Sequence, residues 1–180
     1  MRANVIGRDV IYVSSLGALR SVTAWLASFD LLTLLSPNQP ETDWSGFVRG
    51  RHVRLAFHDI VEPLPGLVAP DRNTIQAILD FGREGTRQRA MLIHCWAGIS
   101  RSSAAAFAIA CDHNPGYERA IADELRRRAA FVTPNRLVVE LADNVLGRGG
   151  RMVDAIDRIG RGAEAFEGKP YQLPLLCPIE

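Results

Sequence analysis

Lysine is almost absent from this sequence of 180 residues, because Lys169 is the only one and arginine supplies the other positive charges. The formal net charge is only +1, so the composition gives no reason to expect nucleic acid or an acidic membrane as a partner. The sequence also lacks a run of about 18 apolar residues, the length that a membrane-spanning helix needs. No basic segment followed by a long apolar run marks its amino terminus as a secretion signal. These absences predict a soluble globular protein with no nucleic-acid or membrane partner.

Cysteine is scarce as well. The three cysteines, Cys95, Cys111 and Cys177, are odd in number and far apart, which favours a reducing compartment over a disulfide framework. We therefore expect a cytoplasmic protein. The histidines show no spacing typical of metal ligands, and neither a metal nor another cofactor is expected. The sequence does not predict an oligomeric state.

The rest of the chain alternates between apolar runs and helical periodicity. Strands are predicted at 10–13, 31–35, 53–57 and 90–93, and helices at 16–29, 74–84, 103–111, 117–130, 135–146 and 152–159. This alternation predicts an α/β fold, with one central, mostly parallel sheet flanked by helices on both faces. One domain over residues 1–160 is expected, followed by an irregular tail, 161–180, that is rich in glycine and proline and packs on the same domain.

The stretch from His94 to Ser102 has the most specific pattern. Cys95 follows the predicted strand at 90–93, five residues form an arch, and Arg101 opens the next helix. A helix amino terminus after a tight loop binds anions, because unpaired backbone N–H groups point at the ion. Gly98 suits the arch since glycine adopts backbone angles closed to other residues, and Arg101 can offer two donors to an oxyanion. The same groups would favour the thiolate form of Cys95, so the pattern predicts phosphoryl transfer to cysteine.

These residues resemble the His-Cys-x5-Arg-Ser/Thr signature of cysteine-dependent protein tyrosine phosphatases, most nearly the bacterial tyrosine and dual-specificity enzymes. The resemblance implies the cysteine phosphatase fold, with Cys95 as the nucleophile and Arg101 as a phosphate ligand. It also implies that Ser102 bonds the departing sulfur, although a helix-start serine bonding its own backbone is an equal alternative. The expected phosphate-binding residues are Trp96, Ala97, Gly98, Ile99, Ser100 and Arg101. We expect His94 to hold the loop through hydrogen bonds rather than to exchange protons with substrate.

Expelling an alkoxide or phenoxide near neutral pH requires a proton donor. Asp59 is the candidate, because it follows the predicted strand at 53–57, opens a loop rich in proline and glycine, and precedes Cys95 by 36 residues. The family acid similarly lies about thirty residues or more upstream, after a strand. A helix or turn cap is the alternative role for Asp59. Asp71 is the rival acid, but its place after Pro70 predicts a helix N-cap.

Asn135 is expected to be another helix cap, and it could also support the site.

The sequence predicts the substrate less specifically than it predicts the reaction. The loop interior, Trp96 to Ser100, holds no basic residue, which argues against a polyphosphorylated substrate. The default is a phosphorylated protein or peptide bound in a shallow cleft that takes phosphotyrosine and can also take phosphoserine or phosphothreonine. Trp96 could form an aromatic wall of this cleft or pack beneath the loop.

Two other classes of protein use related features. A non-catalytic phosphate-binding module would be favoured if cysteine, arginine or acid were missing, and all three are present. Sulfurtransferases of the rhodanese type do not require the arginine at position 101. Arsenate reductases related to the low-molecular-weight phosphatases carry the signature near the amino terminus, whereas here it lies mid-chain. The sequence therefore favours a hydrolase over both.

Overall fold

The computed structural model describes residues 9–40, 42–44, 46, 50–85 and 89–176. Its strands are β1 (Val10–Ser15), β2 (Phe29–Leu35), β3 (His52–Ala56), β4 (Ala90–Cys95) and β5 (Tyr171–Pro174). Its helices are α1 (Leu19–Thr23), α2 (Arg72–Arg83), α3 (Arg101–His113), α4 (Glu118–Arg128), α5 (Arg136–Leu146) and α6 (Arg151–Ile159). None of the helices in these ranges is both long and apolar enough to cross a membrane.

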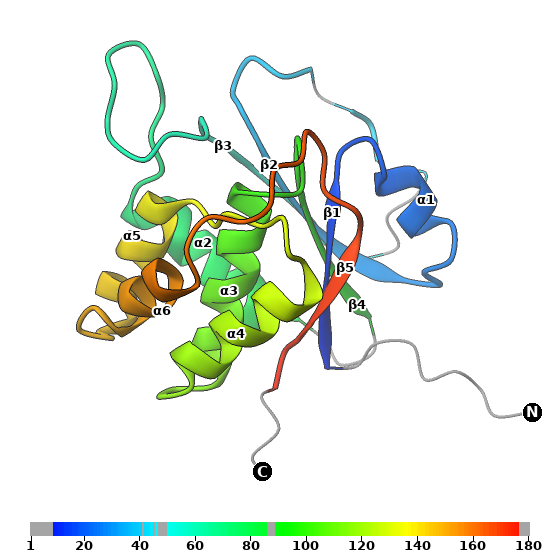
Figure 1. Cartoon of the computed structure of the whole chain (residues 1–180). Coiled ribbons are helices and arrows are strands. Elements are labelled where there is room, and N and C mark those ends of the chain that lie inside the picture. Colours follow the sequence, from blue (N-terminus) through cyan, green and yellow to red (C-terminus); the bar gives the residue numbers. More distant parts are fainter. Residues whose placement is uncertain (1–8, 41, 45, 47–49, 86–88, 177–180) are drawn as a thin grey trace, which may run out of the picture.

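The five strands form one sheet in the order β3-β2-β4-β1-β5. The first four are parallel and β5 runs antiparallel beside β1, which confirms the predicted mostly parallel sheet. The carboxyl ends of β1 and β4 lie side by side, with Ser15 in register with Cys95. This upper edge of the sheet, where the loop after β3 and the start of α3 also lie (Figure 1), is where open α/β sheets bind ligands.

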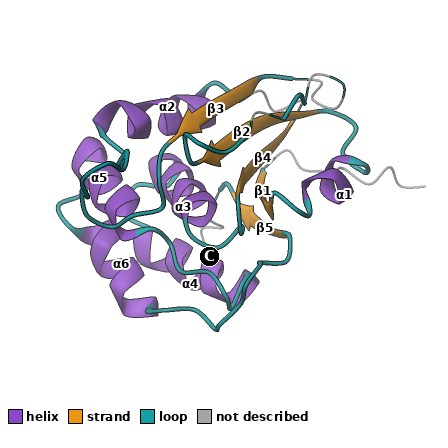
Figure 2. Cartoon of the chain, turned by 90° about the horizontal axis from the view of Figure 1, so that it is seen from above, coloured by secondary structure: helices purple, strands orange, loops and turns teal. Residues whose placement is uncertain are grey.

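Helices cover both faces of the sheet, but unequally. Helices α2 to α6 gather on one face, and the short α1 lies on the other (Figures 1 and 2). The larger core fills the first of these faces. The smaller core, on the α1 side, includes Leu19, Leu92 and Trp44, so Trp44 anchors the loop after β2 on the body of the protein. Aromatic residues in an otherwise polar loop are expected to anchor it, and Phe47, the other aromatic residue of this loop, lies outside the described residues.

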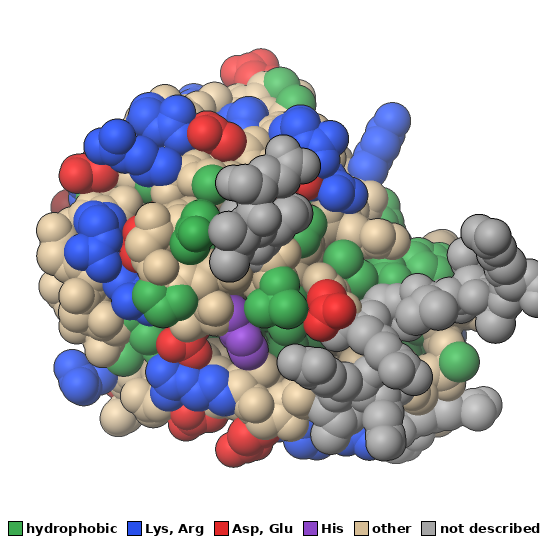
Figure 3. Space-filling view, turned by 90° about the horizontal axis from the view of Figure 1, so that it is seen from below, with side chains coloured by type: hydrophobic (Ala, Val, Ile, Leu, Met, Phe, Trp, Pro, Cys, Tyr) green, Lys and Arg blue, Asp and Glu red, His purple; other side chains and the backbone are tan. Residues whose placement is uncertain are grey.

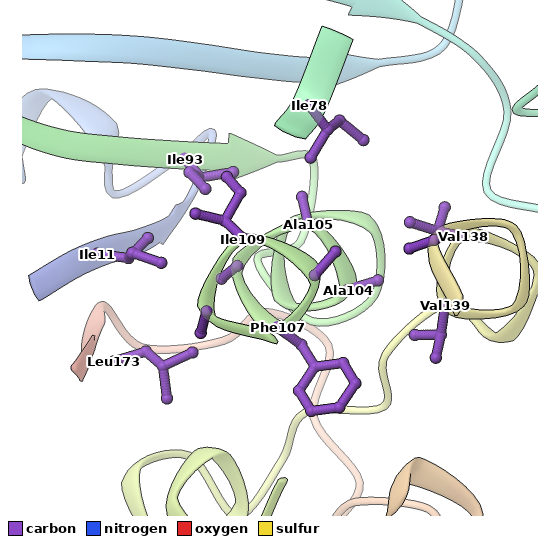
Figure 4. Packing of buried hydrophobic residues seen from close by; sticks show 14 of the residues in the cluster. Ile11, Ile78, Ile93, Ala104, Ala105, Phe107, Ile109, Val138, Val139 and Leu173 are labelled. Atoms are coloured by element: carbon purple, nitrogen blue, oxygen red, sulfur yellow. The ribbon is translucent and has the colours of Figure 1, made fainter. Parts of the chain in front are cut away.

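Helix α3 runs through the centre of the larger core. It is buried from Arg101 to Cys111, and its many alanines allow β4, α2 and α5 to approach closely. Figure 4 shows Ile93, Ile78 and Val138 directed at it from those three elements. This close packing fixes the helix whose first residue, Arg101, follows the signature loop.

Two predicted elements differ from the structure. The helix predicted at 16–29 is only Leu19–Thr23, because the Thr23 hydroxyl bonds the Arg20 carbonyl near the helix end and Phe29 is taken into β2, opposite Ala90. The tail was expected to be irregular, and this was wrong for β5. Its residues Tyr171 and Leu173 are buried while Gln172 is exposed, an alternation too short, beside two prolines, to identify from sequence.

The surface charges are mixed, in keeping with the net charge. Figure 3, which shows the end of the molecule away from the signature loop, has basic and acidic side chains interspersed over its helical half. Several are paired in the structure, such as Arg83 with Asp112 and Arg158 with Asp123.

Candidate functional site: the loop around Cys95

The signature loop, residues 96–100, connects Cys95 at the end of β4 to Arg101 at the start of α3. Cys95 is buried, with 1% of its surface exposed. The strand, tight loop and helix start predicted around this cysteine are therefore all present.

The carbonyl groups of the loop point outward. Four of them accept hydrogen bonds from backbone N–H groups of residues in three other parts of the chain. The pairs are Leu16 with Trp96 (3.1 Å), Gly168 with Ala97 (2.8 Å), Thr133 with Ile99 (3.2 Å) and Asn135 with Ser100 (3.2 Å). In a trans peptide the C=O of one residue and the N–H of the next point in opposite directions. The N–H groups of residues 97, 98, 100 and 101 must therefore point into the arch.

The sulfur of Cys95 lies beneath this arch. The Gly98 N–H donates to Sγ at 3.2 Å, and the Ser102 hydroxyl lies 3.1 Å from Sγ. Gly98 has a φ of +71°, and a Cβ at this position would lie 2.7 Å from the Ser15 backbone nitrogen. Both features require glycine at this point of the loop. Ser102 is thus within hydrogen-bond distance of the sulfur, although its role in a reaction stays a prediction.

Arg101 is buried beside the loop with part of its donor set unused. Its Nη1 donates to the Phe57 carbonyl at 2.8 Å and to the Ser36 hydroxyl at 3.3 Å, which fixes the guanidinium. Its Nε has no hydrogen-bond partner among the described residues. A buried donor without a partner is costly, so an oxyanion that accepts from Nε would be bound favourably.

Asp59 lies at the other side of the loop. Its Oδ1 accepts hydrogen bonds from the Ser100 hydroxyl (2.7 Å) and the Asn135 amide nitrogen (2.8 Å), and its Oδ2 lies 3.9 Å from Arg101 Nε. The loop that begins with Asp59 is closed at its base by His58, whose backbone N–H donates to the Val68 carbonyl. The structure thus brings Asp59 to the signature loop with one oxygen held and the other beside Arg101.

Asp71, the rival acid, is placed differently. Its carboxylate accepts from the backbone N–H and the hydroxyl of Thr74, and it caps the amino terminus of α2. These hydrogen bonds lower its pKa. The predicted N-cap is confirmed, and the hydrogen bonds of the Asp71 carboxylate go to Thr74 rather than to the signature loop. Which carboxyl donates a proton stays a prediction.

His94 is fully buried under the loop. Its Nε2 lies 2.8 Å from the Thr33 hydroxyl, and its ring packs edge-on against Trp44. Burial lowers the pKa of His94 to about 4, and the positive charge of Arg101 contributes to the same shift. The imidazole is therefore neutral near pH 7.

No protein-family model matches the chain, and no curated protein matches it. Solved structures do. The crystal structure of Tk-PTP in the active form matches with a TM-score of 0.55 and 21% identity, over 80% of this chain and 95% of that one. The chain has the fold of the cysteine-based protein tyrosine phosphatases.

Two further solved structures match less closely. The catalytic core of Siw14 has a TM-score of 0.46 and 19% identity, over 85% of this chain and 91% of that one. OH1 from the Orf virus, a tyrosine phosphatase, has a TM-score of 0.39 and 17% identity, over 87% and 82%. The fold assignment depends on the match to Tk-PTP.

Two contributors to the loop of this phosphatase fold were not predicted in full from the sequence. Asn135 caps α5 through its Oδ1, as expected, but its amide nitrogen also holds Asp59. The tail supplies Gly168, which binds the Ala97 carbonyl, and Glu167, which accepts a hydrogen bond from Ser15. Contacts between segments that are distant in the sequence leave no sequence signal here, so none of these three contacts could be predicted from residue spacing.

The described residues contain no group of three or more histidine, cysteine, aspartate or glutamate side chains placed to hold a metal ion.

Proposed function

We propose that this protein is a phosphatase that hydrolyses phosphotyrosine esters in proteins or peptides through a cysteinyl-phosphate intermediate. Phosphoserine and phosphothreonine esters are further candidate substrates. The observation that carries the proposal is the orientation of the signature loop, whose carbonyls are bonded outward so that its N–H groups converge above the Cys95 sulfur. Convergent N–H groups over a nucleophile stabilise a bound phosphoryl group and the charge that develops on it.

In the first step the Cys95 thiolate attacks phosphorus. An S–P bond forms, the P–O bond to the leaving group breaks, and Asp59 gives its proton to the leaving oxygen. Arg101 holds two equatorial oxygens of the transferred group. The unused Nε of Arg101 and its distance of 3.9 Å from Asp59 Oδ2 support this division of roles.

In the second step a water molecule attacks the phosphoenzyme. The Asp59 carboxylate takes the proton from this water, a new P–O bond forms, and the S–P bond breaks. The Ser102 hydroxyl, 3.1 Å from Sγ, donates to the departing sulfur. Inorganic phosphate leaves, and the thiolate and the protonated Asp59 are restored.

The substrate class follows from the loop's side chains. No basic residue stands between Cys95 and Arg101, so the loop offers no cation to a second phosphate group. A side chain with one phosphate group therefore matches this loop, which can bind a single phosphoryl group. We place the reaction in the reducing cytoplasm, where a cysteine nucleophile stays reduced.

The test is turnover of a phosphopeptide panel by the purified protein, its Cys95→Ser variant and a Cys111→Ser control. Cys111 is buried in α3, away from the loop, so its variant controls for loss of a buried thiol. Cys95→Ser should abolish turnover yet still bind inorganic phosphate, whereas Cys111→Ser should keep turnover. Appreciable hydrolysis by Cys95→Ser, or activity that depends on an added metal ion, would contradict the proposed mechanism.

A further inference from the structure

Exposed apolar side chains occur in the signature loop and in the two segments that contact it. Nine large apolar side chains are exposed in the described part of the chain, and six of them lie in the loop or in the two segments that touch it. These six are Val61, Leu64, Leu67, Val68, Trp96 and Phe166. Isolated exposed apolar residues are ordinary, but a group of them beside an anion-binding loop indicates a surface that binds a partner.

Two of the six form a defined pair. The rings of Trp96 and Phe166 meet edge to face, with centroids 5.4 Å apart and an interplanar angle of 85°. Trp96 is 44% exposed and Phe166 is 82% exposed, so the pair has a large open surface. Trp96 directly follows Cys95 in the chain, and this surface therefore adjoins the mouth of the phosphate cradle.

The backbone beside Phe166 is held against the loop. The Gly168 N–H donates to the Ala97 carbonyl at 2.8 Å. The Glu167 carboxylate accepts a hydrogen bond from the Ser15 hydroxyl. It fits there because Gly17 has no side chain, and a Cβ at this position would collide with the carboxylate. Phe166 is thus presented by a segment that is anchored on both the loop and β1. An anchored aromatic side chain binds a ligand at a low cost in conformational entropy.

We propose that Trp96 and Phe166 form a docking site for an apolar side chain next to the phosphorylated residue of a peptide substrate. The proposal rests on the proposed phosphatase function, since it names the sequence context that this site selects. With the phosphate in the cradle, the residues beside the phosphorylated one pass over the rim formed by these two rings. An apolar side chain there buries area on both aromatic faces, whereas a small polar one gains little.

The charges around the site favour a peptide over a lipid surface. The segment 59–71, which carries four of the exposed apolar residues, contains Asp59, Glu62 and Asp71 and no basic residue. Segments that bind anionic membranes carry clusters of lysine and arginine beside their apolar residues. Here the acidic groups would repel such a membrane, and they are compatible with an uncharged or basic peptide.

Binding can be measured without turnover in the Cys95→Ser background. Two labelled phosphotyrosine peptides are compared by fluorescence anisotropy, one with leucine and one with serine on both sides of the phosphotyrosine. The leucine peptide should bind about tenfold more tightly, the gain expected for partly burying a leucine side chain. Adding Phe166→Ser should reduce this preference to about threefold or less.

The control is Tyr117→Ser, which removes another exposed aromatic residue. Tyr117 lies beyond the far end of α3, about 18 Å along the helix from Arg101, and its loss should leave the preference unchanged. No preference in the parent protein, or a preference that survives Phe166→Ser, would overturn the inference. So would Phe166-dependent sedimentation with phosphatidylserine vesicles without a peptide preference, which would make the surface a membrane contact. Hydrolysis of p-nitrophenyl phosphate by the wild-type protein tests the phosphatase activity separately.

Discussion

Acidification should destabilise this protein through one buried side chain, His94. The pKa of His94 is about 4 in the folded chain against an ordinary value of 6.5, because burial disfavours the imidazolium. As the pH falls, the unfolded chain takes up this proton first. The stabilisation is therefore fully present above about pH 6.5 and is lost progressively between 6.5 and 4.

The two pKa values give the size of the effect. A shift of about 2.5 units corresponds to about 3 kcal/mol over the whole pH range. Between pH 7.5 and pH 5 only part of this is lost, about 2 kcal/mol in the free energy of unfolding. That is a large share of the total for a domain whose net stability is about 5–15 kcal/mol.

Urea unfolding at pH 7.5 and pH 5 measures the loss. Other groups titrate over the same range, so the comparison is with His94→Gln, whose amide can still meet the Thr33 hydroxyl, and with His113→Gln, which removes an exposed histidine. The His94→Gln variant should lose about 2 kcal/mol less than the wild type over this interval, whereas His113→Gln should follow the wild type. Equal pH dependence in wild type and His94→Gln would refute the reasoning.

Three further predictions concern the loop and its neighbours. Asp59→Asn should lower kcat for phosphotyrosine peptides by about 10²–10⁴-fold. Esters of activated phenols should be affected less, because an activated phenolate leaves without being protonated. An equal, small loss of kcat for both kinds of substrate would point to another acid. Gly98→Ala should lower the free energy of unfolding by at least about 2 kcal/mol in urea, since a Cβ there meets backbone at a φ of +71°; unchanged stability would contradict the loop geometry. Mild peroxide should inactivate the protein reversibly by converting Cys95 to a sulfenic acid or sulfenamide. Mass mapping should find no disulfide between Cys95 and Cys111. Cys111 lies ten residues beyond Arg101 on one continuous helix, about 15 Å away, which is too far for a disulfide. A Cys95–Cys111 peptide from folded protein would count against it, and Cys177 lies outside the described residues.

The elements with strong local signals could be predicted from the sequence. The N-cap Asp71, the N-cap Asn135 and the C-terminal Gly147 mark helix ends in the structure as they do in the sequence. The strand ending at Cys95 and the helix starting at Arg101 follow from an apolar run and a helical pattern on either side of a glycine-containing loop. In each case a few neighbouring residues decide the backbone conformation.

The parts that were missed depend on distant partners. Leu26 and Phe29 fit a helical pattern, but both pack on the sheet after the chain has left α1, and strand pairing overrides the periodicity. Strand β5 exists because β1 offers it an edge. The second hydrogen bond of Asn135 and the contact of Gly168 with Ala97 likewise depend on the assembled fold.

The hydrogen bonds that hold the carbonyls of the signature loop outward determine when the site can form during protein synthesis. Their donors, Leu16, Thr133, Asn135 and Gly168, span more than 150 positions of the chain, and the last of them leaves the ribosome well after Cys95. Until Gly168 emerges, the peptide unit between Ala97 and Gly98 lacks the bond that holds its N–H toward the sulfur. A nascent chain, or one truncated before Gly168, should therefore carry an incompletely ordered loop, and Cys95 gains its full surroundings only after the chain has been made as far as Gly168.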